Sequence, residues 1–233
     1  MDRKMTDHVL GLEEPLHPGG LPLTGRLVDY CAFPAGALII DLGCGGGVTV
    51  EYLCGVRGLR ASGVDRDKTR LEQGRNRRPE LALVRASGEA LPWPDAAVHG
   101  VLAECSLSVM PAAGKVLAEI NRVLIPGGKL AITDLYARRV NTRRNGGLMS
   151  REEWASLLTG CGFRTLVSED QSACLQEFVA RFILKYGSAE KLWQCTCAGR
   201  DRPPGTQELF TAQQPGYFLL VAEKVTERKD DLV

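Results

Sequence analysis

The chain has 233 residues, which is enough for one α/β domain with a full hydrophobic core. Its 29 basic and 28 acidic residues give a net charge of +1, which argues against a general nucleic-acid or membrane-surface binder. We expect no transmembrane helix, because no apolar run reaches about 18 residues. We also expect no signal peptide, because residues 1–8 lack its apolar h-region. We therefore expect a cytoplasmic protein whose eight cysteines are free thiols. No two cysteines have the C-x-x-C spacing that is typical of a zinc site.

Residues 1–34 precede the first expected strand. Prolines and glycines in residues 1–20 indicate an irregular arm, which either folds over a ligand or remains a solvent-exposed tail. Thr24 is the expected N-cap of a helix that runs through Leu27, Val28 and Tyr30.

The apolar run of residues 38–42 predicts a buried parallel strand, and a glycine-rich turn follows it. The turn reads D-x-G-x-G-x-G, with Asp41, Gly43, Gly45 and Gly47, and Cys44 lies within it. A dinucleotide fingerprint would need glycine where Val48 stands. A carboxylate at this point repels a pyrophosphate and attracts an ammonium or sulfonium group, so the turn favours a cationic ligand.

Three more strands are expected at residues 59–65, 81–85 and 98–104. Asp65 ends the first of them, where a carboxylate is placed to accept hydrogen bonds from both hydroxyls of a ribose. The loop after residue 85 carries Ser87, and Glu104 ends the strand of residues 98–104, directly before Cys105. Ligands of open parallel sheets bind beyond the carboxyl ends of the strands, so these side chains are expected to meet.

The second half of the chain predicts a helix at 111–123 and strands at 130–134, 163–167 and 217–222. Ser150 and Glu153 form an expected capping box. The arginines of residues 138–144 indicate either an anion-capturing lid or a mobile loop. Helical spacing within residues 168–216 predicts a further helix, carried by Leu175, Phe178, Val179, Phe182 and Tyr186.

In combination, these motifs resemble those of class I S-adenosylmethionine (SAM) dependent methyltransferases of the type 11, UbiE-like branch. Residues 41–47 resemble motif I of that family, residues 86–95 resemble its "G-D-A-E-x-L-P-F-x-D" segment, and residues 122–130 resemble its "R-V-L-K-P-G-G-x-L" turn. The resemblance covers residues 35–167 and the final strand, 217–224. It implies a Rossmann-like fold with a seven-stranded, mostly parallel sheet flanked by helices, in one domain of residues 1–233. Residues 168–216 would form an inserted cap that binds substrate.

The resemblance also implies the cofactor and its contacts. SAM would be the methyl donor and S-adenosylhomocysteine (SAH) the product. Asp65 matches the family's ribose-binding acid, whereas Ser87 stands where the family has an aspartate that reads adenine, with the Gly88 amide beside it. The implied cofactor-binding residues are Asp41, Gly43, Cys44, Gly45, Gly47, Asp65, Arg66, Ser87, Gly88, Glu89, Ala103 and Glu104.

Methyl transfer is an in-line displacement that depends mainly on alignment, so neither a metal nor a general base is obligatory if the acceptor is already a good nucleophile. We expect a small-molecule acceptor and a monomer or homodimer. The candidate catalytic residues are Glu104, Cys105, Asp134 and Tyr136.

Two alternatives remain open at this point. Residues 104–109 resemble the "N-C-V-L-N-L" pattern of arsenic(III) methyltransferases, in which the cysteine binds the metalloid; Cys105 would then act with Cys195 and Cys197. That family's cysteine in the loop after the fifth strand is missing here. The second alternative is a SAM-binding partner protein without transferase activity.

Overall fold

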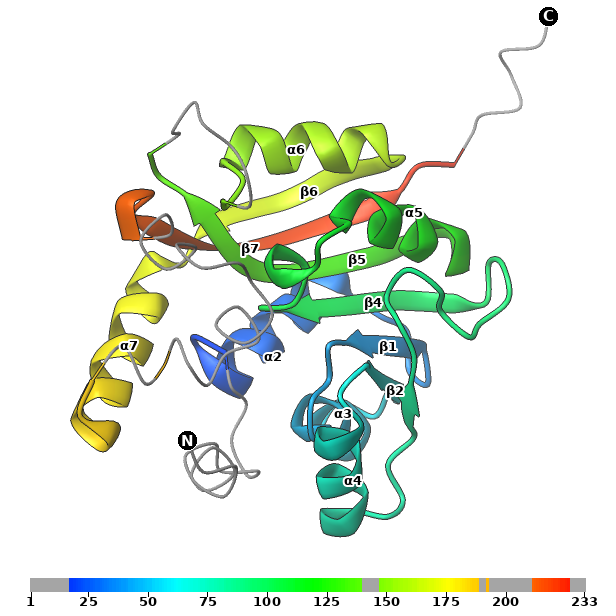
Figure 1. The fold of residues 1–233 in the computed structure, drawn as a ribbon. Helices are drawn as coiled ribbons and strands as arrows, with labels where there is room; N and C mark the ends of the chain where they lie inside the picture. The colour runs from blue at the N-terminus through cyan, green and yellow to red at the C-terminus, as the bar shows by residue number, and fades with distance from the viewer. Residues whose placement is uncertain (1–16, 140–146, 189–191, 193–210, 227–233) are drawn as a thin grey trace, which may run out of the picture.

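The computed structural model describes residues 17–139, 147–188, 192 and 211–226. In this part of the chain, one seven-stranded sheet has the order β3-β2-β1-β4-β5-β7-β6 (Figure 1). The strands β1 to β5 pair in parallel, and β7 runs antiparallel to β5 and β6. The predicted mostly parallel sheet is therefore confirmed. The strands are β1 Leu38–Leu42, β2 Arg60–Asp65, β3 Leu83–Arg85, β4 Val98–Glu104, β5 Leu124–Ala137, β6 Phe163–Asp170 and β7 Pro215–Lys224.

The strand β5 is much longer than predicted. The sequence indicated a turn at residues 126–128 and a strand only at 130–134, whereas the structure keeps Leu124 to Ala137 in the sheet. A bulge makes this possible, because Val98 pairs with Leu124 while Gly100 pairs with Lys129. Gly127 adopts a φ of 73°, so the extra residues loop outward without ending the strand.

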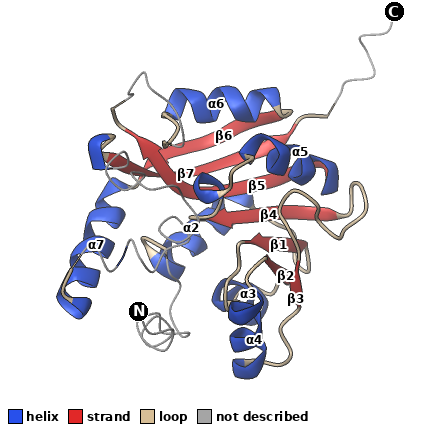
Figure 2. Cartoon of the chain, viewed as in Figure 1, coloured by secondary structure: helices blue, strands red, loops and turns tan. Residues whose placement is uncertain are grey.

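Helices cover both faces of the sheet (Figure 2). They are α2 Gly20–Cys31, α3 Val48–Gly55, α4 Lys68–Arg77, α5 Ala113–Val123, α6 Arg151–Gly160 and α7 Ser172–Tyr186, with a short 3-10 helix at Leu107–Val109. Successive strand residues point to opposite faces, so the core divides in two. Ile39 and Leu102 pack with α2 and α3, and Ile40 and Val101 pack with α5 and α6.

The helix boundaries bring one confirmation and one correction. Ser150 caps α6 in a complete capping box with Glu153, as predicted. Thr24 is not an N-cap. The helix α2 begins at Gly20, because Gly19 adopts a left-handed φ of 81° and starts the helix one turn earlier. Thr24 therefore lies inside α2, fully buried.

The region expected to form a cap contains the predicted helix, α7, which projects beyond the rest of the fold (Figure 1). Its apolar stripe packs only in part, because Phe182 is buried whereas the other four residues of the stripe are half-buried. Cys195, Cys197 and most of the arginine-rich loop lie outside the described residues. Among those that are described, no helix has both the length and the apolar character needed to cross a membrane.

Candidate functional site

The turn between β1 and α3 is held open by three glycines. Gly43, Gly45 and Gly47 have φ values of 84°, 54° and 77°, which L-residues with side chains rarely adopt. The amides of Gly43 and Cys44 both donate to the carbonyl of Val64 in β2, at 2.8 and 3.1 Å. A Cβ atom on Gly43 would lie 2.7 Å from the Cβ of Ser106, so the backbone of the turn packs closely against the Ser106 side chain.

Asp65 connects this turn to the end of β2. Its Oδ2 accepts the amide of Gly45 at 2.9 Å, and its Oδ1 accepts the amide of Asp67 at 2.8 Å. Each carboxylate oxygen has a second lone pair that these bonds leave available. The half-buried Asp65 is thus fixed in orientation and can still accept hydrogen bonds from a ligand's hydroxyl groups.

Two further carboxylates lie at the same edge. Asp41 in β1 is 4% exposed, and its Oδ2 has no hydrogen-bond partner among the described residues. Burial raises the pKa of Asp41 well above its usual value, and the charges of Glu104 and Asp65 raise it further. Like charges held together in a dry site favour a cationic ligand, as the sequence predicted for this turn.

The loop after β3 carries Ser87, Gly88 and Glu89. The Ser87 hydroxyl accepts the Glu89 amide at 3.3 Å, a local turn that the sequence did not reveal. Gly88 lies against an apolar surface, since a Cβ atom there would come within 3.4 Å of Leu42, Val116 and Met110. The loop therefore presents backbone and apolar contacts rather than a charged side chain, as expected for the neutral Ser87.

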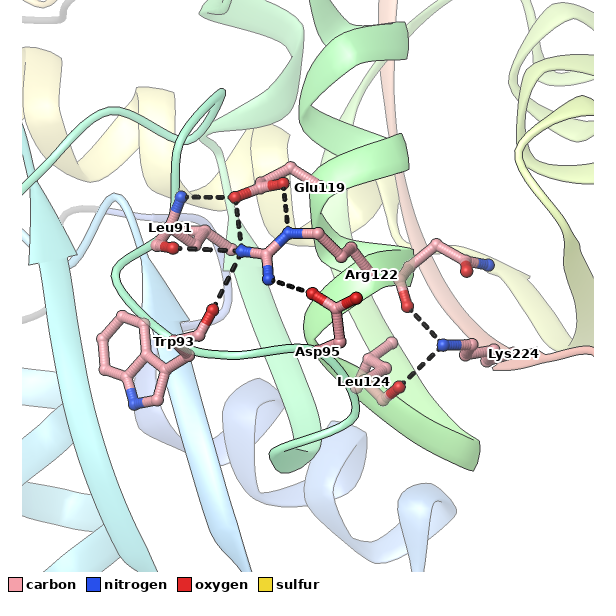
Figure 3. Close-up of polar contacts among 8 residues, drawn as sticks. Leu91, Trp93, Asp95, Glu119, Arg122, Leu124 and Lys224 are labelled. Carbon is pink, nitrogen blue, oxygen red and sulfur yellow. Dashed lines mark hydrogen bonds and ion pairs between the residues drawn. The ribbon is translucent and has the colours of Figure 1, made fainter.

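Helix α5 holds this loop in place (Figure 3). Glu119 accepts the Leu91 amide at 2.8 Å, and the Arg122 guanidinium donates to the carbonyls of Leu91 and Trp93 at 3.2 and 2.9 Å. Arg122 also pairs with Glu119 and with the exposed Asp95. The arginine that resembles the family's R-V-L turn thus acts structurally, through the backbone of the neighbouring loop.

Of the other expected cofactor residues, Cys44 and Ala103 are packed, and Arg66 is exposed. The Cys44 side chain fills the space above Gly63, where a Cβ atom would lie 2.6 Å from its sulfur. Burial raises the pKa of Cys44, which makes it a small apolar residue and not a reactive thiol. The Arg66 carbonyl accepts the Arg85 Nε at 3.3 Å.

The candidate catalytic residues separate into two groups. Glu104 and Cys105 lie at the end of β4, beside the glycine turn. Asp134 and Tyr136 lie in β5, and their polar atoms are engaged within the fold: Asp134 accepts the amides of Ser108 and Leu135, and the Tyr136 hydroxyl donates to Asp170 at 2.6 Å.

The environment of Cys105 does not favour metalloid chemistry. Its thiol donates to the Tyr217 hydroxyl at 3.3 Å, and burial raises its pKa well above the usual value, with the Asp134 charge adding to the shift. A soft metalloid needs the thiolate, which this environment opposes. Within the described ranges, no three His, Cys, Asp or Glu residues are grouped so that they could hold a metal ion.

Asp134 should make stability depend on pH. Burial raises the pKa of this fully enclosed carboxyl from 3.8 to about 6. Because the folded pKa is raised, the stabilising contribution is complete below the unfolded pKa of 3.8 and is lost as the pH rises through about 6. We expect the free energy of unfolding to fall by up to roughly 3 kcal/mol over this range, relative to Asp134→Asn, which carries no titratable group there. Urea unfolding of both proteins from pH 4 to pH 7 measures this difference. The same pH dependence of the free energy of unfolding in both proteins would contradict the prediction.

Sequence reasoning missed two residues at this edge, His17 and Thr24. Both contact the Glu104 carboxylate, at 3.4 Å from the His17 Nε2 and at 3.0 Å from the Thr24 Oγ1. His17 lies before α2, outside any periodic pattern that could have predicted its burial. Thr24 was predicted to cap a helix, and this prediction hid its contact with Glu104. His17, in the segment expected to be an irregular arm, therefore lies against the end of β4, whereas residues 1–16 lie outside the described residues.

Comparison with known proteins places this geometry in a family. Residues 40–132 match the family model described as a methyltransferase domain. The O-methyltransferase resE of Aspergillus sclerotiorum is 30% identical over 236 residues, which cover 91% of this chain and 85% of that protein. The methyltransferase GfsG of Streptomyces halstedii is 30% identical over 131 residues, and this alignment spans 54% of this chain but only 47% of that relative.

A solved structure shares the fold. Phosphoethanolamine N-methyltransferase 2 of Haemonchus contortus, determined in complex with SAM, aligns with a TM-score of 0.74 at 15% identity. The alignment covers 95% of this chain and 56% of that one, and at this identity it supports the fold alone. The relative that matches nearly the full length is a methyltransferase, and the glycine turn, the acid that ends β2 and the sheet order fit the same family. The chain therefore belongs to the class I SAM-dependent methyltransferases.

Proposed function

We propose that this chain transfers a methyl group from SAM to a small organic acceptor. The observation that carries the proposal is the group of carboxylates around the glycine turn, with the Asp41 Oδ2 buried and unpartnered among the described residues. A ligand that brings positive charge and hydroxyl donors fits this edge, and SAM has both. An NAD-type ligand would place a pyrophosphate there instead, against Asp41.

Different residues at this edge bind different parts of the cofactor. Asp65 accepts the ribose hydroxyls, and the turn from Gly43 to Gly47 lets the backbone approach the ligand. The loop at Ser87 to Glu89 lies against the adenine through backbone and apolar contacts. When bound, SAM supplies an electrophilic methyl carbon on a sulfonium, and the protein aligns the acceptor with it and excludes water.

The acceptor class follows from the relatives. By their names, one relative is an O-methyltransferase and a protein of the same fold is a phosphoethanolamine N-methyltransferase. We propose that this chain likewise methylates a small molecule, and that residues 168–216, which include α7, select it. We propose the acceptor without naming the methylated atom. The proposal also includes one domain of residues 1–233, because β1 and β7 share one sheet, and a cytoplasmic enzyme that acts as a monomer or homodimer.

Calorimetry with SAH and with NAD tests the cofactor first. We expect SAH to bind in the micromolar range and NAD not to compete; tight NAD binding without SAH binding would overturn the proposal. Methyl transfer from labelled SAM is then measured with panels of phenols, alcohols and amines, and in parallel with arsenite and a thiol. Turnover of an organic acceptor supports the proposal, whereas turnover of arsenite alone would establish the metalloid alternative.

A further inference from the structure

Glu104 is an acid held by an unusual number of partners. It ends β4 and is 9% exposed. The Thr24 hydroxyl lies 3.0 and 3.1 Å from its two oxygens, and the Thr49 hydroxyl donates to Oε2 at 3.5 Å. Thr24 comes from α2 and Thr49 from the first turn of α3. Two helices and one strand therefore fix this single carboxylate in position.

A third partner, His17, comes from the segment before α2. Its ring is 7% exposed, with Nδ1 3.3 Å from the carbonyl of Pro18 and Nε2 3.4 Å from Glu104 Oε2. No hydrogen bond satisfies Nε2 within the described residues. The contact brings His17 against the end of β4.

These contacts leave Glu104 able to bind more. A carboxylate has about four acceptor positions. Thr49 and His17 face Oε2, whereas among the described residues Oε1 is contacted only by the Thr24 hydroxyl, whose single proton Oε2 and the Gly20 carbonyl also share. Oε1 therefore keeps an acceptor position.

The charge balance of the site is also incomplete. Asp41 adds a second buried carboxylate that interacts with Glu104 and has an unpartnered oxygen. Burial and the charge of Glu104 raise the pKa of Asp41, and a positively charged donor beside both groups would stabilise their ionised forms. A positively charged hydrogen-bond donor is therefore missing from the set, and an ammonium group supplies both the charge and three protons.

We propose that Thr24 and His17 are positioning residues: they hold Glu104, one of the cofactor-binding residues that the family resemblance implies, so that its carboxylate binds the ammonium group of the cofactor's amino-acid half. The inference rests on the proposed function and extends the cofactor site to a segment that precedes the first strand. Thr24 acts through the carboxylate and not by touching the ligand. Its loss should therefore weaken only ligands that carry the ammonium.

The test compares two ligands by calorimetry. SAH carries the amino-acid half, and 5′-methylthioadenosine has the same adenosine without it. Thr24→Val keeps the shape of the side chain and removes the hydroxyl, Thr24→Ser restores a hydroxyl, and Thr165→Val on the exposed face of β6 is the matched control. We expect Thr24→Val to weaken SAH about tenfold, with methylthioadenosine unchanged and Thr24→Ser close to the unmodified chain. Glu104→Gln should show the same selectivity with a larger loss.

The outcomes separate this inference from the proposed function. Failure of the unmodified chain to bind SAH would overturn both. Normal SAH binding that Thr24→Val leaves unchanged would overturn the inference alone. An equal loss for both ligands in Thr24→Val would also overturn it, because that result describes a general structural defect. His17→Asn extends the comparison and should lower SAH affinity selectively as well.

Discussion

Replacing Asp65 by alanine is expected to lower SAH affinity by about 100-fold or more. Asp65 accepts the amides of Gly45 and Asp67, so its loss leaves two backbone donors without their partner. It also removes the proposed acceptor for the ribose hydroxyls. Hydrogen bonds to charged groups contribute about 1.5–3 kcal/mol each, and two of them lost from the complex correspond to at least this change in affinity.

Calorimetry with SAH and with methylthioadenosine measures this effect. Both ligands carry the ribose, so both should weaken together, in contrast to the selective loss expected for Thr24→Val. Glu72→Gln on the exposed face of α4 is the control, because Glu72 forms a solvent-exposed ion pair with Lys68 of the same helix. Affinity within threefold of the unmodified chain for Asp65→Ala would show that the acid at the end of β2 does not bind the ribose.

Replacing Gly74 by alanine should destabilise the protein, although alanine is the better helix former. Gly74 lies within α4, where the change would by itself stabilise by about 1 kcal/mol. Its Cβ atom would, however, lie 2.5 Å from the carbonyl oxygen of Gly46 and 2.8 Å from a methyl group of Leu83. The first of these atoms belongs to the backbone of the glycine turn and cannot rotate away. Overpacking of this kind costs about 1–3 kcal/mol, so the clash outweighs the helix preference.

The same clash should reach the ligand. Gly46 lies between Gly45 and Gly47, so its displacement distorts the turn and should lower SAH affinity at least about tenfold. Gly160→Ala in α6 is the matched helical control, since nothing lies within 4 Å of its Cβ position. It should leave stability unchanged or raise it by about 0.5–1 kcal/mol. Urea unfolding and calorimetry measure both variants; equal stabilisation by the two alanines would contradict the close packing of α4 on the turn.

Local sequence patterns predicted most of the framework. Continuous apolar runs identified the buried strands β1, β4 and β7, because a buried strand must be apolar over its length, whereas β6 is largely exposed. The sequence also predicted the capping box at Ser150 and the turn with glycines at residues 43, 45 and 47, because each of these satisfies a requirement of the local backbone. Acids at strand ends were placed together because parallel strands end at one edge of the sheet.

Other features depended on contacts between distant segments. The hydroxyl of Tyr136 pairs with Asp170, 34 residues away, and no spacing rule predicts that partner. Asp134 looked like a free acid at a strand end and instead holds the amide of Ser108.

By itself, the sequence determined the sheet, the glycine turn and the acids around it, because these follow from burial and backbone geometry within short stretches. Only the tertiary structure decided which polar groups hold those acids. Thr24 and Glu104 are separated by 80 residues, and they meet because α2 packs across the end of β4. A hydrogen bond between distant segments produces no periodic pattern in either of them. The hydrophobic pattern of each segment reflects its buried apolar residues and does not indicate which polar residues will pair.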